Sequence, residues 1–461
     1  MFLGFLAPGL FLVLLVAVIA VIVAASRRQG DDEEEGPGIG TLKRVFYYFL
    51  GFVALGVAAA GLSLLMSTLL GPLFVDKLIV DSGSRLALAL ALTVVATPIW
   101  MYLWARSQHA VVEYPAEARS LGRQFYLHLI LGITAAVAAG SVVSILQWSF
   151  GINEDPSLAM SVLLIMAGIW FFHWRAARGG GLPNKGISVL MSRLYIYVTA
   201  LYALVMLAAG TGIVLYRSLL EAYEGVLHTP LLGLDTVQFW SRGMRESLSF
   251  AVVGGVWWSA HWLLMARGNQ QSGLRQVYLY LFAVFGGALT VVVSTALLLH
   301  GTLQWLVGAP GLDAPAEHFR FLPSVIAGLV IGSWLWGYHH AVIKEESTGN
   351  EGRFVAARRG YQYLLSAVGL GTLAVGLVIA FGVAIGLLLP GLPTLVPTAD
   401  WKRLITLAVT SSLWGLPCGV TFGVVSRRKQ RPLRLKRGAA PPAASSSMPF
   451  SESRCSSRWG T

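Results

Sequence analysis

Histidines are the side chains of this sequence that could hold a cofactor inside its long apolar segments. Imidazoles from two neighbouring helices can hold a haem iron between them. The histidines near the ends of apolar segments are His128, His173, His261, His339 and His340. No His-x-x-His or His-Glu-x-x-His spacing adds support for a metal site. We favour interfacial histidines that bond to loops or headgroups, and we predict no cofactor and no metal ligand.

Catalytic residues have no recognisable pattern in the sequence. The 22 Asp and Glu residues fall outside the apolar segments or at their ends, and no Lys or Arg lies near the middle of one. Ion-coupled carriers commonly rely on such a group within the membrane. Neither a Gly-x-Ser-x-Gly elbow nor a phosphate-binding loop is found. The two cysteines, Cys418 and Cys455, exclude a disulfide framework. We therefore predict no catalytic residue and a protein that is not an enzyme.

Long apolar runs are the elements that must position these side chains. The chain has 461 residues, of which 56% are hydrophobic and 12% are charged. A helix needs about 20 apolar residues to cross a bilayer. The runs that meet this requirement are 2–25, 45–70, 86–104, 125–150, 158–174, 194–216, 248–265, 277–307, 322–338, 361–389 and 404–424. The sequence therefore predicts an all-α, polytopic helical membrane protein with about 11 transmembrane helices.

The distribution of basic residues predicts how these helices are oriented. The chain has 34 Lys and Arg residues and a formal net charge of +12. Most of the basic residues fall in alternate connections, at 26–44, 105–124, 175–193, 266–276, 339–360 and after 424. Basic loops are retained in the cytoplasm. We therefore predict a multi-pass protein of the bacterial inner membrane with its N-terminus outside and its C-terminus in the cytoplasm, and no binding to nucleic acid.

Two marks recur along the chain and define an internal repeat of two helices. The first helix of each repeat starts at a basic residue followed by aromatic residues: Arg44, Arg123, Arg193, Arg275 and Arg359. The second helix carries a ridge of rings spaced four residues apart, which comprises Trp100, Trp104, Trp170, Trp174, Trp257, His261, Trp334, Tyr338 and Trp414. Positions four apart share one helix face. We favour helix packing for this ridge, and a shared ligand groove is the alternative.

The repeats predict the organisation of the whole chain. Residues 1–25 form a leader transmembrane helix, which a signal peptidase could remove, and 26–42 form an acidic linker rich in Gly and Pro. A transmembrane domain over 43–425 contains helical-hairpin repeats at about 43–106, 123–175, 193–266, 275–340 and 359–425. The tail, 426–461, is basic and then rich in Ala, Pro and Ser, which predicts disorder. The expected partners are the lipid bilayer, anionic headgroups for the tail, and other membrane proteins.

These motifs are similar to those of a known family. The Arg-x-Tyr-x-Tyr pattern, seen at Arg193 and again at Arg359, precedes a helix that carries Gly-x-Trp. This combination resembles the bacterial membrane family catalogued as domain of unknown function 5671, in tandem copies over about 43–425. The chain departs from the pattern at Pro98 in the first repeat and at Ser412 and Cys418 in the fifth. The resemblance implies a multi-pass membrane protein and no particular activity.

Three functions remain open from the sequence. The favoured one is a non-enzymatic scaffold or accessory protein that binds other membrane helices or lipid, because no Asp, Glu, Lys or Arg lies near the middle of a predicted span. A transporter or channel for an uncharged or apolar solute would use the ridges as walls. A membrane haem or redox protein would use the histidines. Ridges that converge on a cavity would favour a ligand, and ridges that are dispersed would favour packing.

Overall fold

The structure is a computed structural model that describes residues 41–74, 82–178, 186–227, 240–269, 272–310, 314–348, 355–389 and 400–416. Every regular element in these ranges is a helix, which confirms the all-α prediction. The predicted leader helix, 1–25, and the tail, 426–461, lie outside the described residues, as does the linker up to residue 40.

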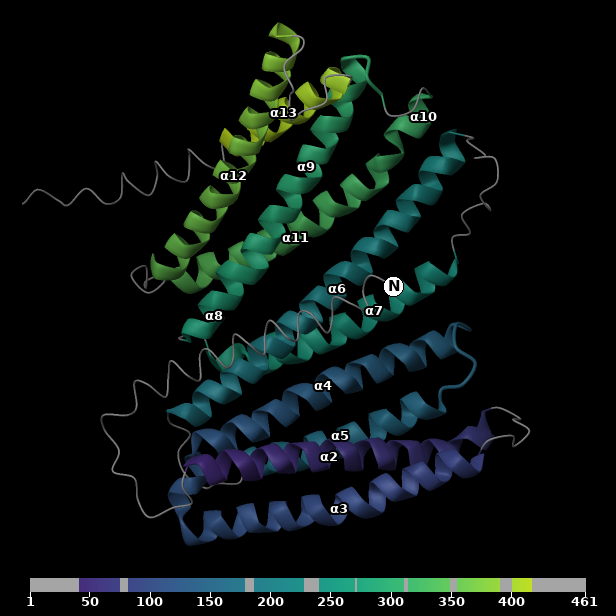
Figure 1. The fold of residues 1–461 in the computed structure, drawn as a ribbon, viewed down its shortest axis with the longest axis vertical. Coiled ribbons are helices and arrows are strands. Elements are labelled where there is room, and N and C mark those ends of the chain that lie inside the picture. Colours follow the sequence, from purple (N-terminus) through teal and green to yellow (C-terminus); the bar gives the residue numbers. More distant parts are fainter. Residues whose placement is uncertain are drawn as a thin grey trace, which may run out of the picture.

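Consecutive long helices pair as hairpins, which we number 1 to 5 (Figure 1). Hairpin 1 pairs α2 (Thr41–Leu70) with α3 (Ser82–Glu113), and hairpin 2 pairs α4 (Leu121–Ser149) with α5 (Ser157–Arg178). Hairpin 3 pairs α6 (Ile187–Leu227) with α7 (Arg242–Trp258) and its continuation η3 (Ser259–Met265). Hairpin 4 joins α8 (Gly273–Val277), η5 (Tyr278–Val284) and α9 (Phe285–Leu306) to α11 (Leu322–Ser347), and hairpin 5 pairs α12 (Val355–Leu388) with α13 (Trp401–Leu416). Short helices in the connections are η1 (Gly71–Leu73), η2 (Pro115–Arg119), η4 (Arg267–Asn269), α10 (Pro315–His318) and η6 (Phe319–Phe321).

Nine helical segments of the described chain are long and apolar enough to cross a membrane. They correspond to the predicted spans from 45–70 to 361–389, and α13 follows the next predicted span as far as the description reaches. In lipid, a spanning segment must satisfy its own backbone hydrogen bonds, which a helix does. The helices also extend beyond the predicted spans. Helix α6 has 41 residues and continues through the stretch after 216 that the apolar run did not include.

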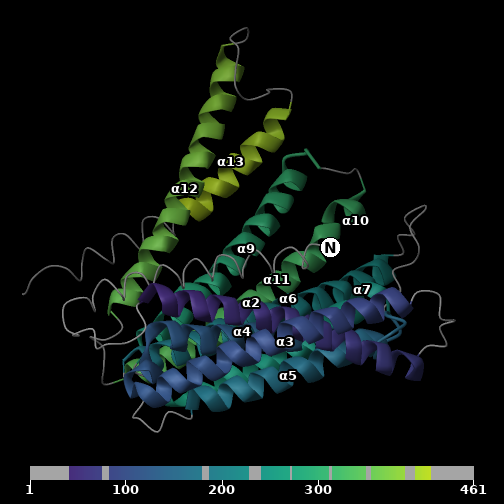
Figure 2. The same ribbon diagram turned by 60° about the horizontal axis from the view of Figure 1, so that its bottom comes forward.

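The hairpins lie side by side in a row that follows their order in the sequence (Figure 1). Helix α4 contacts α2 on one side and α6 and α7 on the other, while α11 contacts α6 and α13 contacts α9. Hairpins 1 and 5 lie at opposite ends of the row, so the described hairpins do not close into a ring. In Figure 2, α12 and α13 lean away from the layer formed by the first three hairpins.

Glycine allows the two helices of hairpin 3 to approach closely. A Cβ atom on Gly210 would collide with the backbone of Ala251, and one on Gly254 would collide with the backbone of Leu207. Small residues at such positions let helix backbones pack directly against each other in membranes. A Cβ atom on the neighbouring Gly255 would make an ordinary contact with the Leu207 side chain, at 3.7 Å. Gly210 and Gly254 are therefore positions where hairpin 3 excludes a side chain, and Gly255 is not.

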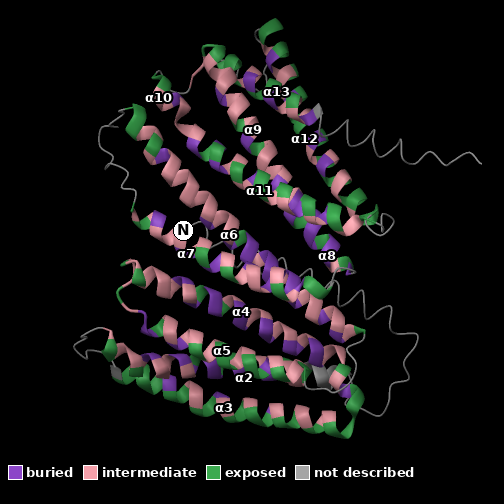
Figure 3. Cartoon of the chain, turned by 180° about the vertical axis from the view of Figure 1, so that it is seen from behind, coloured by how far each residue is buried: buried purple, intermediate pink, exposed green. Residues whose placement is uncertain are grey.

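Buried residues concentrate between hairpins, and the outer faces are exposed and apolar (Figure 3). The largest buried cluster joins hairpins 2, 3 and 4, and it includes Tyr195, Trp258, Trp262 and Tyr278. Helix α3 and helix α12, near the two ends of the row, show long exposed stretches in Figure 3. The exposed side chains of these helices are largely apolar, which suits contact with acyl chains.

Candidate functional site

The predicted ridges lie where successive hairpins meet. Three ring pairs four residues apart are stacked, with centroid separations of 6.2 Å for Trp100 and Trp104, 5.8 Å for Trp170 and Trp174, and 6.3 Å for Trp334 and Tyr338. This spacing places both rings of a pair on the same helix face. The first two pairs lie in hairpins 1 and 2, and each pair packs against the hairpin that follows it.

A hydrogen bond from tryptophan to tyrosine connects each of the first three hairpins to the next one. The indole Nε1 donors and phenol oxygen acceptors are Trp100 to Tyr126 at 3.4 Å, Trp170 to Tyr195 at 3.0 Å, and Trp258 to Tyr278 at 3.0 Å. Each tyrosine lies in the first turns of the next hairpin, shortly after the arginine that starts the repeat. The aromatic residues that recur at that position therefore serve as acceptors for the preceding hairpin.

A buried histidine completes each of these contacts. The Nδ1 atoms of His173, His261 and His339 lie 2.8, 2.9 and 2.8 Å from the carbonyl oxygen four residues earlier in their own helices. A carbonyl oxygen can only accept, so Nδ1 carries the hydrogen and Nε2 presents a lone pair. The repeat thus fixes the same histidine tautomer three times.

We call these clusters joints 1, 2 and 3. Joint 1 comprises Trp100, Trp104, Arg123, Tyr126 and His173; joint 2 comprises Trp170, Trp174, Tyr195 and His261; and joint 3 comprises Trp258, Trp262, Arg275, Tyr278 and His339. In joint 2, the Tyr195 hydroxyl lies 3.1 Å from His261 Nε2 and donates to it. In joints 1 and 3, the equivalent Nε2 atoms of His173 and His339 are buried and have no hydrogen-bond partner among the described residues.

The starting arginines of hairpins 2 and 4 hold the hairpin that precedes each of them. Arg123 donates to Ser107 at 3.0 Å and to Gln108 at 3.2 Å, both near the end of α3. Arg275 donates to the Ala266 carbonyl at 3.1 Å. The guanidinium carbon atoms of these two arginines lie 5.6 and 4.3 Å from the ring centroids of the joint's second tryptophan. Such cation–π contacts strengthen when they are shielded from water.

Arg275 also forms a buried ion pair in hairpin 4. Its guanidinium lies 2.6 Å from Glu346 near the end of α11, and both side chains are less than a tenth exposed. Of the other starting arginines, Arg359 is exposed, and the side chain of Arg44 lies outside the described residues. Arg193 lines a pocket that is described below.

Two predicted ridge residues in hairpin 3 occupy different places from their counterparts. Trp257 donates to the Ala135 carbonyl of α4 at 3.1 Å, and His261 takes the histidine position of joint 2. The tryptophan positions of joint 3 belong to Trp258 and Trp262, which are not among the predicted ridge residues. Aligning the His-Trp pairs, which recur at residues 173–174 and 261–262, would have revealed this register.

The remaining ridge residues and histidines are dispersed. Tyr338 accepts from Trp262 Nε1 at 3.0 Å, and Trp334 packs edge-on against Trp258. Trp414 belongs to hairpin 5, where its indole nitrogen is buried without a partner in the described chain. His128 Nδ1 lies 2.8 Å from the Gln124 carbonyl oxygen. His340 stacks on Trp336. Within the described ranges, no three His, Cys, Asp or Glu residues gather as they would around a metal ion.

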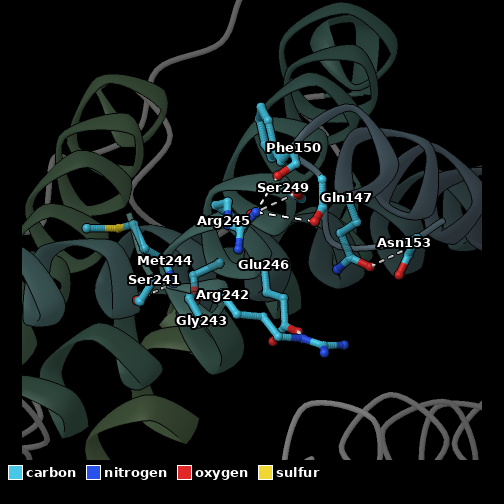
Figure 4. A network of polar contacts seen from close by, with 12 residues as sticks. Gln147, Phe150, Asn153, Ser241, Arg242, Gly243, Met244, Arg245, Glu246 and Ser249 are labelled. Atoms are coloured by element: carbon cyan, nitrogen blue, oxygen red, sulfur yellow. Dashed lines mark hydrogen bonds and ion pairs between the residues drawn. The ribbon is translucent and has the colours of Figure 1, made fainter. Parts of the chain in front are cut away.

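A separate polar network ties hairpins 2 and 3 at the opposite end of the helices (Figure 4). Arg245, in the first turn of α7, donates to the Phe150 carbonyl at 2.5 Å. Ser241 caps the same helix by accepting from the Met244 backbone N–H at 3.3 Å. These contacts satisfy backbone groups at a turn and at a helix end, so their role is structural.

The comparisons with known proteins support the repeat. The family model described as Domain of unknown function (DUF5671) matches residues 44–154 and 193–338. The first matched segment contains the tryptophans and tyrosine of joint 1, and the second contains those of joint 3. Joint 2 connects the two copies, because its tryptophans lie between the segments and its tyrosine lies in the second. No curated protein and no solved structure matches the chain.

Proposed function

The chain belongs to the family described as domain of unknown function 5671, and since that description assigns no activity, we propose a function from the contacts of its helices. We propose a non-enzymatic membrane scaffold: a row of hairpins that binds other membrane helices or lipid along its outer faces. The observation that carries the proposal is that the ring ridges pack between successive hairpins at three separate joints. This dispersal favours packing over the transporter hypothesis, in which the ridges would line one shared cavity.

An exposed stripe on α2 supports the binding of another helix. Its members recur every three or four residues and are large and apolar: Phe46, Phe49, Leu50, Val53 and Val57. Gly56 lies on α2 next to Val57, and it has no atom near the place of a Cβ. A stripe of this kind can pack against a second helix or against acyl chains. Helix α2 contacts α3, α4 and α5, and the stripe lies on the face that these contacts leave exposed.

To test the proposal, the full-length protein is extracted from its membrane directly into lipid nanodiscs without detergent. The mass of the intact particles is then measured. We expect a second membrane protein, or a lipid enriched over the bulk membrane, to remain bound. Replacing Phe49 and Val53 together by Ala should reduce that component. The matched control replaces Val375 and Val378, which are exposed on α12, by Ala and should retain it. Recovery of a bare monomer with bulk lipid would contradict the proposal.

A haem or redox role is the second candidate, and one observation favours it. The Nε2 atoms of His173 and His339 have no hydrogen-bond partner in the part of the chain that the structure describes, while Nδ1 of each donates to a backbone carbonyl. Metal-binding histidines are commonly oriented in this way. An absorbance spectrum of the protein purified from its native host decides the matter. A Soret band lost in His173→Ala or His339→Ala would support this role, and a spectrum without one would exclude haem.

For the orientation in the membrane, we propose that the three joints lie at the cytoplasmic end of the helices. The support is the placement of Arg123, Arg275 and Arg178 at that end, where they contact tryptophan rings. Basic residues next to interfacial aromatics are typical of the cytoplasmic boundary. The opposite end, which carries the turn between α4 and α5, would then face outward.

A further inference from the structure

A pocket of about 520 Å³ lies between the starts of hairpins 3 and 4. One wall is the first turn of α6 with Gly186, and the other is Ser272 and Gly273 at the start of α8. Helix α6 has 41 residues, and α8 continues through η5 and α9 as one segment, Gly273–Leu306, of 34 residues. Two long helices therefore point their N-terminal backbone N–H groups and positive dipole ends toward the same space.

The polar side chains among the described residues that line this pocket are an arginine and a serine. Arg193 is the charged side chain among the described residues that line it, and none of these residues is acidic. Ser272 is only 3% exposed, yet its side chain makes no capping hydrogen bond at the helix that it starts. Leu190 and Leu274 add apolar walls. An arginine, a buried hydroxyl and two helix N-termini are groups that bind phosphate oxygens.

The same position in the first family copy shows what such a helix start binds. Ser120 precedes Arg123 by three residues, as Ser272 precedes Arg275, and both serines are N-caps. The Ser120 hydroxyl accepts from the Arg123 backbone N–H at 3.3 Å and donates to a Glu117 oxygen at 3.0 Å. In the first copy, the chain thus places a buried carboxylate of its own beside the N-terminus of α4.

The second copy lacks that internal anion. Three residues before Ser272, where Glu117 stands relative to Ser120, the chain has the uncharged Asn269. The serine hydroxyl that the first copy uses on its own glutamate is left to line the pocket. We propose that this pocket binds the phosphate group of an external ligand, supplied either by the headgroup of an anionic phospholipid or by free phosphate. The bound phosphate takes the place that Glu117 occupies in the first copy.

This site rests on the proposed scaffold function, because it assumes that the protein lies in a membrane. It adds one class of lipid that the scaffold would bind. Its position at the start of two predicted spans places it at the depth of the headgroups. Loss of the phosphate site would leave protein partners of the α2 face unaffected. A negative result in the nanodisc experiment on Phe49 and Val53 therefore does not imply a negative result in the binding experiment below, and the reverse also holds.

The test measures binding to the full-length protein in an uncharged detergent by calorimetry. The probes are dihexanoyl phosphatidylglycerol, inorganic phosphate and dihexanoylglycerol, which lacks phosphate. Ser272→Asp should weaken phosphatidylglycerol binding by about tenfold or more, because it supplies the carboxylate internally. Asp is a favourable N-cap, so the variant should fold. The matched control, Ser241→Asp, makes the same change at the N-cap of α7 and should bind like wild type. Arg193→Gln provides a second variant, with a similar loss expected.

The three probes separate the sources of the phosphate. Binding of phosphatidylglycerol alone identifies a lipid headgroup, and binding of both phosphate compounds with similar affinity identifies free phosphate as sufficient; either outcome supports the site. Dihexanoylglycerol that binds as tightly as the phospholipid would overturn the proposal. So would absence of binding, or equal binding by wild type, Ser272→Asp and Arg193→Gln.

Discussion

At the scale of single residues, the joints show how a membrane protein satisfies buried polar groups. In joint 2, Trp170 donates to Tyr195, Tyr195 donates to His261, and His261 donates to a backbone carbonyl. Each donor has an acceptor, so the chain of bonds is complete. In joints 1 and 3, the Nε2 atom of the histidine has no hydrogen-bond partner among the described residues. The joints should therefore differ in how strongly they depend on the tyrosine hydroxyl.

Tyr195→Phe should lower the free energy of unfolding by about 1–2 kcal/mol, because it removes the partner of Trp170 Nε1 and of His261 Nε2. Tyr126→Phe should have a smaller effect, since the Trp100 bond that it removes is the longest of the three at 3.4 Å. Tyr202→Phe, on the same helix as Tyr195, is the control. Thermal unfolding in detergent compares the stabilities of the three variants. Equal losses for the two joint tyrosines would contradict the completed network of joint 2.

The buried ion pair of hairpin 4 predicts a larger effect. Glu346→Gln leaves the Arg275 charge buried without its counter-ion, and breaking a buried pair in this way costs about 3–5 kcal/mol. Glu345→Gln changes the adjacent, exposed glutamate and should be near neutral. Chemical unfolding of both variants provides the measurement. A Glu346→Gln protein as stable as the Glu345→Gln protein would show that the pair is hydrated and contributes little.

At the scale of helices, periodicity alone predicted the spans but not the register of hairpin 3. Apolar runs identify spanning helices because lipid requires both apolar side chains and satisfied backbone groups. The ridge in hairpin 3 was placed on Trp257 and His261 by counting four residues per face. Trp258, His261 and Trp262 have the same spacing as Trp170, His173 and Trp174 in α5. The register was therefore missed because the Gly-x-Trp pattern was aligned instead of the His-Trp pairs.

The hydrogen bonds of the joints could not be predicted from the sequence, because they connect residues of different hairpins. Trp258 and Tyr278 are each recognisable as interfacial aromatics, but their pairing depends on how hairpins 3 and 4 pack. The recurrence of arginine and tyrosine at the start of each repeat did mark the right helix turns. This recurrence did not indicate which tryptophan bonds to each tyrosine, because the packing of the hairpins determines that pairing.

Close helix packing in hairpin 3 gives a prediction with an internal control. Gly254→Ala should destabilise the protein by about 2 kcal/mol or more, since its methyl group meets the backbone of Leu207. Gly255→Ala, one residue on, meets only a side chain at ordinary distance and should be neutral or slightly stabilising. Unfolding temperatures of the two variants are compared. Similar values would show that α6 and α7 separate without cost.

At the scale of the whole molecule, the structure is an open row. The main contacts of each described hairpin are with its neighbours in sequence, as in soluble repeat proteins. The sequence predicted the repeat but not whether it closes, because closure depends on the small rotation between successive hairpins. The family match supports tandem copies over residues 44–154 and 193–338, and α5 and hairpin 5 lie outside the matched residues.

The proposed orientation predicts the labelling of single cysteines in whole cells. In a background where Cys418 and Cys455 are Ser, Glu154→Cys, in the exposed turn between α4 and α5, should react with an impermeant maleimide from outside. Ala116→Cys, in the connection after α3, should react only after the membrane is opened. The reverse pattern would invert the topology, and it would place the joints and the phosphate pocket outside the cell.

A row with two free ends has a mechanical consequence. If the chain is pulled from its C-terminal end, hairpin 5 meets the load first, and its main described contacts with the rest of the chain are with α9 and η5. The Trp–Tyr hydrogen bonds that connect hairpins 1 to 4 bear no load until hairpin 5 has been extracted from the membrane. Extraction should therefore proceed in steps of one hairpin, with a weak first step and higher forces at joint 3 and then at joint 2.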